Sequence, residues 1–167
     1  MRFCFKFENY KQKINSMQKH FDILIKTRQL LLKITEHLSM DQLNKIPQGF
    51  KNNIAWNIAH LTVTQQLLCY KLSGLNCLVS EEMIANFQKG TVPNHPISQE
   101  EFEAIKVQFL QLPLQLEEDY NKGIFKNYSE YKTSVNITLN SVEEGITFNT
   151  YHEGIHLGIM LQLMKFV

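Results

Sequence analysis

Proline and glycine are scarce in this sequence, whose 167 residues include only 4 Pro and 7 Gly. Few turn-forming residues imply long elements, which favours helices over an all-β fold built from many short strands. The length is that of about one domain. Hydrophobic residues make up 44% of the chain, which is enough to build a single core. We therefore expect one largely helical domain.

Charge of one sign and long apolar runs are also missing. Lys and Arg number 17 against 16 Asp and Glu, whereas a nucleic-acid binder usually carries a strongly basic domain. No apolar run approaches the roughly 20 residues of a membrane span. Lys6 and Glu8 interrupt the apolar N-terminus, so it does not read as a secretory signal. We expect a cytoplasmic protein with no nucleic-acid and no membrane partner.

The three cysteines, Cys4, Cys69 and Cys77, form no recognisable pattern. An odd number without metal-site spacing argues against both a disulfide framework and a cysteine-based zinc site. Free thiols in a reducing compartment are the simpler interpretation.

Apolar residues recur at helical spacing in four segments. They cover about 16–38, 53–73, a stretch from 98 that contains Pro113, and a stretch from 141 to near the C-terminus. Ser98 and Ser141 each precede a glutamate by three residues, a pattern typical of helix N-termini. Gly74 is a plausible helix stop, and Pro113 is expected to kink the third segment or to remove a hydrogen bond from it.

The connections between these segments differ in length. Residues 75–97 form a long link with a short amphipathic piece at 81–88, and 128–140 look extended or irregular. The pattern predicts an all-α fold, a four-helix bundle with a long connection between helices 2 and 3. We expect residues 1–15 to be a poorly ordered N-terminal extension and residues 16–167 to be the domain, with Met17 as an alternative start to Met1.

Three histidines interrupt the apolar stripes of two helices. His60 lies on the second segment, and His152 and His156 lie one helical turn apart on the fourth. A single histidine on an apolar face is usually an ordinary core residue. Three on interior stripes favour a shared divalent metal, because neutral imidazoles are good ligands for one. The other histidines, His20, His37 and His95, are expected at the surface or in loops.

The fourth segment also contains H-E-x-x-H, the sequence from His152 to His156. In zinc proteases the glutamate of that motif is the general base. Here only eleven residues follow His156 and none is His, Asp or Glu, so a metallopeptidase is a remote alternative. Glu153 is a candidate general base at a small-molecule site, or else a solvated or supporting residue. Asn149 is a candidate for orienting a ligand or a metal-bound water, or else an ordinary polar residue. Arg28 is expected to extend its charged end to solvent, with contact to a substrate as the alternative.

Two short blocks carry a family resemblance. They are Trp56-Asn57-Ile58-Ala59-His60-Leu61 in the second segment and Tyr151-His152-Glu153-Gly154-Ile155-His156-Leu157-Gly158 in the last. Together they resemble the DinB/YfiT-like superfamily, from about Met17 to the C-terminus. The resemblance implies an all-α, antiparallel four-helix bundle with a long connection between helices 2 and 3, in which His60, His152 and His156 hold nickel or zinc. Some members of that superfamily are thiol S-transferases, others act as isomerases or hydrolases, and many have no assigned activity.

Two functional hypotheses follow. In the first, the protein is a metal-dependent transferase of the thiol S-transferase type or a hydrolase, acting on a small molecule such as a low-molecular-weight thiol. In the second, it is a non-catalytic, stress-related bundle that binds a metal or a small ligand. A homodimer fits the long helices and the 11% aromatic content.

Overall fold

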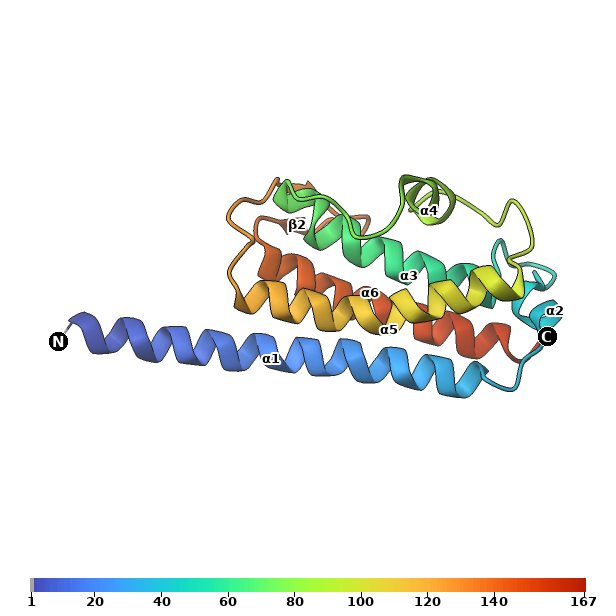
Figure 1. Cartoon of the computed structure of the whole chain (residues 1–167), viewed down its shortest axis with the longest axis horizontal. Coiled ribbons are helices and arrows are strands. Elements are labelled where there is room, and N and C mark those ends of the chain that lie inside the picture. Colours follow the sequence, from blue (N-terminus) through green and yellow to red (C-terminus); the bar gives the residue numbers. More distant parts are fainter. Residues whose placement is uncertain (1) are drawn as a thin grey trace.

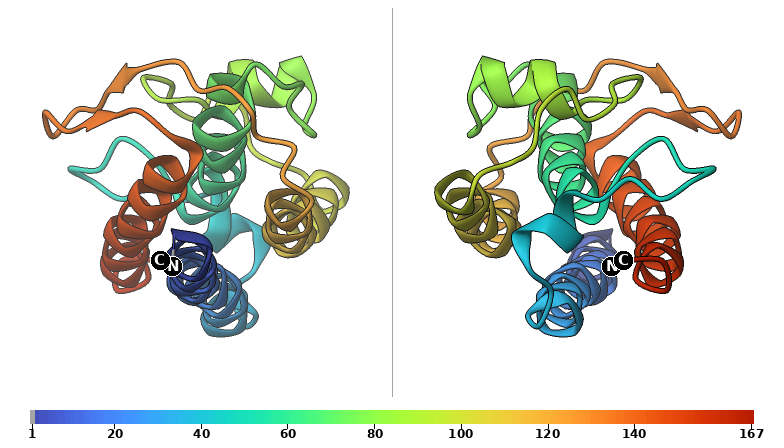
Figure 2. Two further views of the ribbon diagram at one scale, coloured as in Figure 1. Left: turned by 90° about the vertical axis from the view of Figure 1, so that its left-hand side faces the viewer. Right: turned by 90° about the vertical axis from the view of Figure 1, so that its right-hand side faces the viewer.

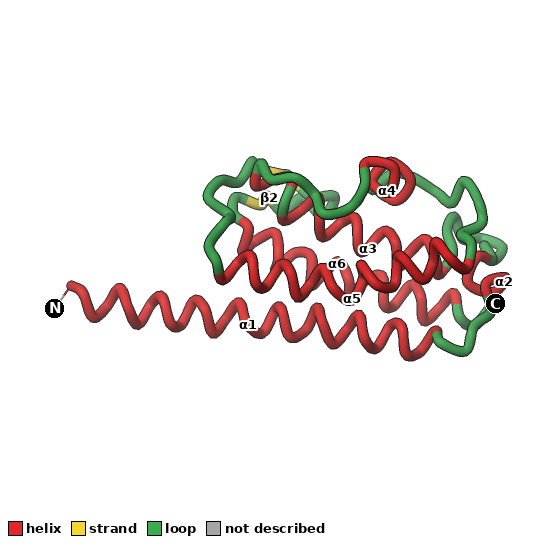
Figure 3. Tube along the Cα trace, viewed as in Figure 1, coloured by secondary structure: helices red, strands yellow, loops and turns green. Residues whose placement is uncertain are grey.

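Four long helices make up most of the molecule (Figures 1 and 3). The computed structural model describes the backbone of residues 2–167 and the side chains of residues 17–167. The long helices are α1 (Arg2–Thr35), α3 (Ile54–Cys69), α5 (Gln99–Asn121) and α6 (Val142–Leu163). Shorter elements are α2 (Met40–Asn44), the 3₁₀ helix η1 (Lys71–Ser73), α4 (Glu81–Phe87), β1 (Tyr131–Lys132) and β2 (Thr138–Leu139). The predicted all-α class is confirmed.

Each of the four long helices packs against two of the others. Helix α3 contacts α5 and α6, and α1 contacts the same two. Figure 1 shows α1 and α6 running in one direction and α3 and α5 in the other. The expected antiparallel arrangement therefore holds for the pairs α3–α6 and α1–α5, while α3–α5 and α1–α6 are parallel. Because α3 and α5 are parallel, the chain must travel from the C-terminal end of α3 back to the level of its N-terminal end before α5 begins. The long link that contains η1 and α4 spans this distance.

The helix ends follow the capping residues in the sequence. The Ser98 hydroxyl accepts a hydrogen bond from the Glu101 backbone N–H at 3.1 Å, and Ser141 caps α6 in the same way. Asn53 caps α3 by accepting from the backbone N–H of Trp56. Gly74 has the left-handed φ of 73° and ends η1. Each cap satisfies a backbone donor that the helix itself leaves free.

Helix α1 begins at Arg2, well before the start near residue 16 that the sequence predicts. In Figure 1 its N-terminal turns extend past the ends of the other long helices. The side chains of residues 1–16 lie outside those that the structure describes. A separate, poorly ordered extension over residues 1–15 stays a prediction.

The segment expected to be irregular contains a small antiparallel hairpin. Tyr131 pairs with Leu139 and Lys132 with Thr138, and Asn136, at a φ of 65°, lies in the turn. Figure 2 shows the hairpin and α4 on the same side of the molecule as α3, with the hairpin beside α6 as well. The two long connections therefore cover one side of the α3–α6 pair.

The core consists of two apolar clusters. One contains Phe21 and Leu24 of α1 with Ile146 of α6, and the other contains Leu31 of α1 with Met160 of α6. Arg28 and Glu153, both fully buried, lie between these positions on the same two helices. A layer of buried polar groups therefore crosses the middle of the molecule.

Candidate metal centre

The three histidines on the apolar stripes come together in the structure. His60 comes from α3, and His152 and His156 come from the neighbouring α6. One ring nitrogen from each lies within 4.8 Å of the others. The four-residue spacing places the two α6 imidazoles on one face, with ring centroids 4.4 Å apart. This group can hold a metal ion.

Backbone and amide oxygens fix the tautomers of two of the rings. His60 Nδ1 lies 2.6 Å from the Phe87 carbonyl oxygen, which can only accept, so Nδ1 carries the proton. His156 Nδ1 lies 2.6 Å from Asn57 Oδ1. The Asn57 amide nitrogen donates to the Asn53 carbonyl oxygen at 2.6 Å, which orients its oxygen towards His156. The Nε2 atoms of His60 and His156 are therefore left with lone pairs, the form that binds a metal.

The remaining ring nitrogens of His152 and His156 are placed better for binding one cation than for a hydrogen bond between them. His156 Nε2 lies 3.1 Å from His152 Nε2. Two ligands of one tetrahedral ion, with bonds of about 2.0–2.1 Å, would have nitrogens about 3.4 Å apart. The Nδ1 atom of His152 is buried and has no hydrogen-bond partner in the structure. The donor set and its spacing therefore suit a divalent metal.

Burial keeps all three imidazoles neutral at physiological pH. Desolvation lowers the pKa of His60, and its hydrogen bond to the Phe87 carbonyl opposes this in part. Desolvation, followed by the charges of His156 and His60, lowers the pKa of His152 to about 3. Desolvation and then His60 lower the pKa of His156 to about 4. Neutral imidazole is the protonation state that a metal needs, since bound protons compete with the ion.

The histidine cluster opens on a cavity of about 600 Å³. Its walls come from α3, η1, the connection after α4, the hairpin and α6. The Trp56 indole stacks on the His60 ring, with centroids 4.5 Å apart and planes 10° from parallel. A small molecule in this cavity would therefore lie against the histidine cluster.

The family follows from a comparison with known proteins. A family model described as the DinB superfamily matches residues 23–160, a range that contains all three histidines. The chain belongs to the DinB superfamily. The resemblance inferred from the two sequence blocks is thereby confirmed. A search of curated proteins finds no match. None of the described helices in this DinB-superfamily chain is both long and apolar enough to cross a membrane.

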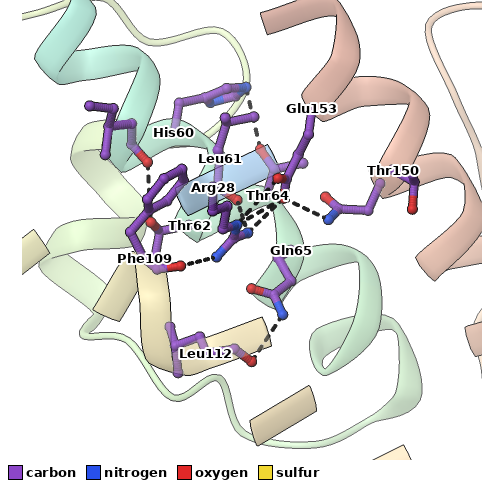
Figure 4. A network of polar contacts seen from close by, with 12 residues as sticks. Arg28, His60, Leu61, Thr62, Thr64, Gln65, Phe109, Leu112, Thr150 and Glu153 are labelled. Atoms are coloured by element: carbon purple, nitrogen blue, oxygen red, sulfur yellow. Dashed lines mark hydrogen bonds and ion pairs between the residues drawn. The ribbon is translucent and has the colours of Figure 1, made fainter. Parts of the chain in front are cut away.

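The two candidate catalytic residues, Glu153 and Asn149, are bonded to each other in a buried polar cluster around Arg28. Figure 4 shows Glu153 beside Arg28 in this cluster. Glu153 is 1% exposed and forms an ion pair with Arg28, whose Nη2 lies 2.7 Å from Glu153 Oε1. The fully buried Asn149 donates from its amide nitrogen to the same carboxylate at 3.0 Å. Neither Glu153 nor Asn149 lines the cavity beside the histidines. Both the solvated position considered for Glu153 and the solvent-extended position expected for Arg28 are wrong.

A proline in α5 completes the surroundings of Arg28. Pro113 has no N–H, so it cannot bond the carbonyl oxygen of Phe109 four residues earlier. Arg28 Nη1 donates to that oxygen at 2.9 Å instead, while Nη2 also reaches the Leu61 carbonyl oxygen at 3.3 Å. With Glu153 on α6, one guanidinium from α1 therefore bonds to all three other long helices. Of the two effects expected of Pro113, a kink or a lost hydrogen bond, the lost bond is observed, and α5 runs unbroken from Gln99 to Asn121.

Sequence reasoning missed the two groups that orient the ligands, Asn57 and the Phe87 carbonyl. Asn57 is fully buried and lies one turn before His60 in α3, yet its partner His156 is 99 residues away. Its place in the sequence block that carries the family resemblance, one turn before His60, was the available signal. Of the remaining histidines, His37 and His95 are exposed as expected, and His20 is half-buried.

Proposed function

We propose that this DinB-superfamily protein is a metal-dependent enzyme that acts on a small molecule, as a transferase of the thiol S-transferase type or as a hydrolase. His60, His152 and His156 would hold a divalent ion, zinc or nickel. One observation carries the proposal: three neutral imidazoles converge on the wall of a cavity large enough for a small molecule.

Three neutral ligands leave the positive charge of a bound ion uncompensated. Such an ion lowers the pKa of a bound water or thiol, and this is the chemistry it would supply here. Trp56 restricts water and movement on one side of His60 by stacking on it. The Thr64 hydroxyl lines the cavity 3.3 Å from His60 Nε2, where it can donate to a ligand atom beside that ring.

For Glu153 and Asn149 we propose a structural role in place of the catalytic one considered from the sequence. The Glu153 carboxylate already accepts three hydrogen bonds from Arg28 and one from Asn149. A general base must reach the proton that it removes, and this carboxylate lines no wall of the cavity. The H-E-x-x-H sequence therefore gives no support here to a metallopeptidase.

We further propose that the long helices form a four-helix bundle of the DinB type and that the protein is cytoplasmic. A homodimer is part of the same proposal. The non-catalytic alternative, a bundle that binds a metal or small ligand without turnover, differs from the enzyme in one measurable respect, because only the enzyme turns over a substrate.

The metal site is tested by elemental analysis of tagless protein and of His60→Ala, His152→Ala and His156→Ala. We expect about one divalent ion per chain in the parent and a large loss in each variant. His95→Ala, which removes an exposed imidazole outside the cluster, is the matched control and should keep its metal. Unchanged metal content in all three cluster variants would exclude the shared site.

The activity is tested by following metal-dependent conjugation of low-molecular-weight thiols to an electrophile such as bromobimane, together with hydrolysis of small esters and amides. We expect turnover that stops on chelation and returns with zinc or nickel. Stoichiometric metal without turnover of either kind would favour the non-catalytic alternative.

A further inference from the structure

The cavity is a trough with two different ends. Along α3 and into η1 it is lined by His60, Thr64, Leu67 and Lys71, which are three or four residues apart and so share one face. At 1.5 Å per residue, Lys71 lies about 16 Å from His60 along the helix axis. Its side chain is long enough to reach back over part of that distance.

The opposite wall has the same order. On α6 the lining residues are His156, His152 and Phe148, read against the direction of the chain. Because α3 and α6 are antiparallel, this series runs in the same direction as the one from His60 to Lys71. The histidines of both walls therefore lie near one end, beside Trp56, the apolar Leu67 and Phe148 lie further along, and Lys71 lies at the far end.

The charge lining the trough is entirely positive. Lys71 and Lys89 line it, and no aspartate or glutamate does. Among the side chains that the structure describes, neither lysine has a carboxylate within 4.0 Å. Lys89 follows Phe87 by two residues, and the Phe87 carbonyl bonds His60, so Lys89 belongs to the histidine end. Lys71 is the cation of the distal end.

We propose that the trough takes an amphiphilic organic anion: a small molecule with an apolar body and an acid group, whose acid is bound by Lys71 and whose reacting end lies at the histidines. The apolar middle, with Leu67, Leu72 and Phe148, excludes water around the body. An anion is favoured because the local field is positive before any metal binds. The assignment of the reacting end rests on the proposed function, whereas the binding of the acid by Lys71 does not.

Binding can be measured with three probes of one length: octanoate, octan-1-ol and octylamine. Trp56 is the only tryptophan in the chain and lines the cavity, so its fluorescence reports occupancy. Titrations are made on the full chain after chelation and again after loading with zinc. We expect octanoate to bind at least about tenfold more tightly than the amine in both forms, with the alcohol between them.

Two substitutions test whether Lys71 binds the carboxylate of octanoate. Lys71→Gln should weaken octanoate about tenfold and leave octan-1-ol unchanged, and Lys71→Arg should retain octanoate binding. Lys132→Gln is the matched control, because Lys132 lies between the lining residues Tyr131 and Thr133 yet does not line the cavity itself. Circular dichroism verifies that each variant is folded.

Several outcomes would overturn the proposal. One is equal affinity for the three probes, and another is octanoate binding that Lys71→Gln does not weaken. Octanoate binding only to the zinc-loaded form would place the acid on the metal, and so would also reject the role of Lys71. The metal or activity tests can fail while Lys71→Gln still weakens octanoate binding to the chelated protein. That result would reject the proposed enzyme and keep the anion site.

Discussion

At the scale of single residues, the orientation of His156 depends on one amide. Asn57 accepts from His156 Nδ1 at 2.6 Å and is itself held by the Asn53 carbonyl and the Asn52 side chain. Groups of this kind fix the tautomer and the ring direction of a metal ligand. A site built from three imidazoles thus depends on residues that would never touch the metal.

Replacing Asn57 should therefore weaken metal binding without removing a ligand. We expect Asn57→Leu to lower zinc affinity about 10- to 100-fold in competition with a chromophoric chelator. Asn57→Asp keeps an acceptor for Nδ1 and should retain most of the affinity. Asn52→Leu, which removes only a bond to the Asn57 amide nitrogen, is the control. An unchanged affinity in Asn57→Leu would show that the packing of α6 alone orients His156.

At the scale of elements, the buried face of α6 carries residues of two polar clusters. His152 lines the cavity, while Glu153 and Asn149 point into the buried layer with Arg28. The helix must approach α3 closely to place both. A glycine permits this: a Cβ at Gly145 would lie 2.7 Å from Tyr128 Oη and 3.0 Å from the Leu68 carbonyl oxygen.

Two glycine substitutions in α6 should consequently have opposite effects. Gly145→Ala should destabilise the fold by about 1–3 kcal/mol, because backbone and tyrosine must shift to admit the methyl group. Gly158→Ala, where the new methyl group meets nothing within 4 Å, should stabilise by about 0.5–1 kcal/mol through helix propensity. Urea denaturation of both variants measures this, and equal effects would mean that the close approach is not a constraint.

At the scale of the whole molecule, Arg28 links all four long helices through Glu153, the Phe109 carbonyl and the Leu61 carbonyl. Its guanidinium also lies over the Phe109 ring, 4.7 Å from the centroid. A buried ion pair adds little over a well-packed apolar pair, but removing one partner leaves an uncompensated buried charge. We therefore expect this layer to contribute more to the choice of helix partners than to the free energy of unfolding.

Breaking this pair should be costly, and removing both partners less so. We expect Glu153→Gln and Arg28→Met each to lower the free energy of unfolding by about 3–5 kcal/mol, and the double variant Arg28→Met/Glu153→Leu to lose less than their sum. Lys122→Met, which breaks the exposed pair with Glu118, should leave the urea midpoint unchanged. If Glu153→Gln retains metal and full stability but loses all turnover, Glu153 is catalytic and not structural.

Metal binding should also stabilise the molecule as a whole, because its ligands join α3 to α6. Free zinc at about 100 times its dissociation constant contributes about 2.7 kcal/mol, or a rise in Tm of about 5–10 °C for a chain of this size. Differential scanning calorimetry with and without chelator measures the rise. His152→Ala should show no rise with zinc, whereas a rise of the same size in that variant would locate the stabilising metal elsewhere.

The sequence by itself determined the local features of this protein. Helix ends at Ser98 and Ser141 depend on bonds within a few residues, so a short stretch of chain is enough to predict them. The histidine group was predictable for a related reason: His152 and His156 share a helical face by spacing alone, and His60 lies on an apolar stripe that must face inward.

Only the tertiary structure decided the rest. The Arg28–Glu153 pair joins residues 125 apart, so no local pattern separates a buried arginine from a solvated one. The Asn57–His156 bond spans 99 residues, and the trough exists only because α3 and α6 run antiparallel beneath the hairpin and the link after α4. Helix periodicity determines which face of a helix is buried, but the packing of helices determines which side chains come into contact there. Those contacts decide whether a buried polar residue of α6 becomes a candidate metal ligand, as His156 does, or part of an ion pair, as Glu153 does.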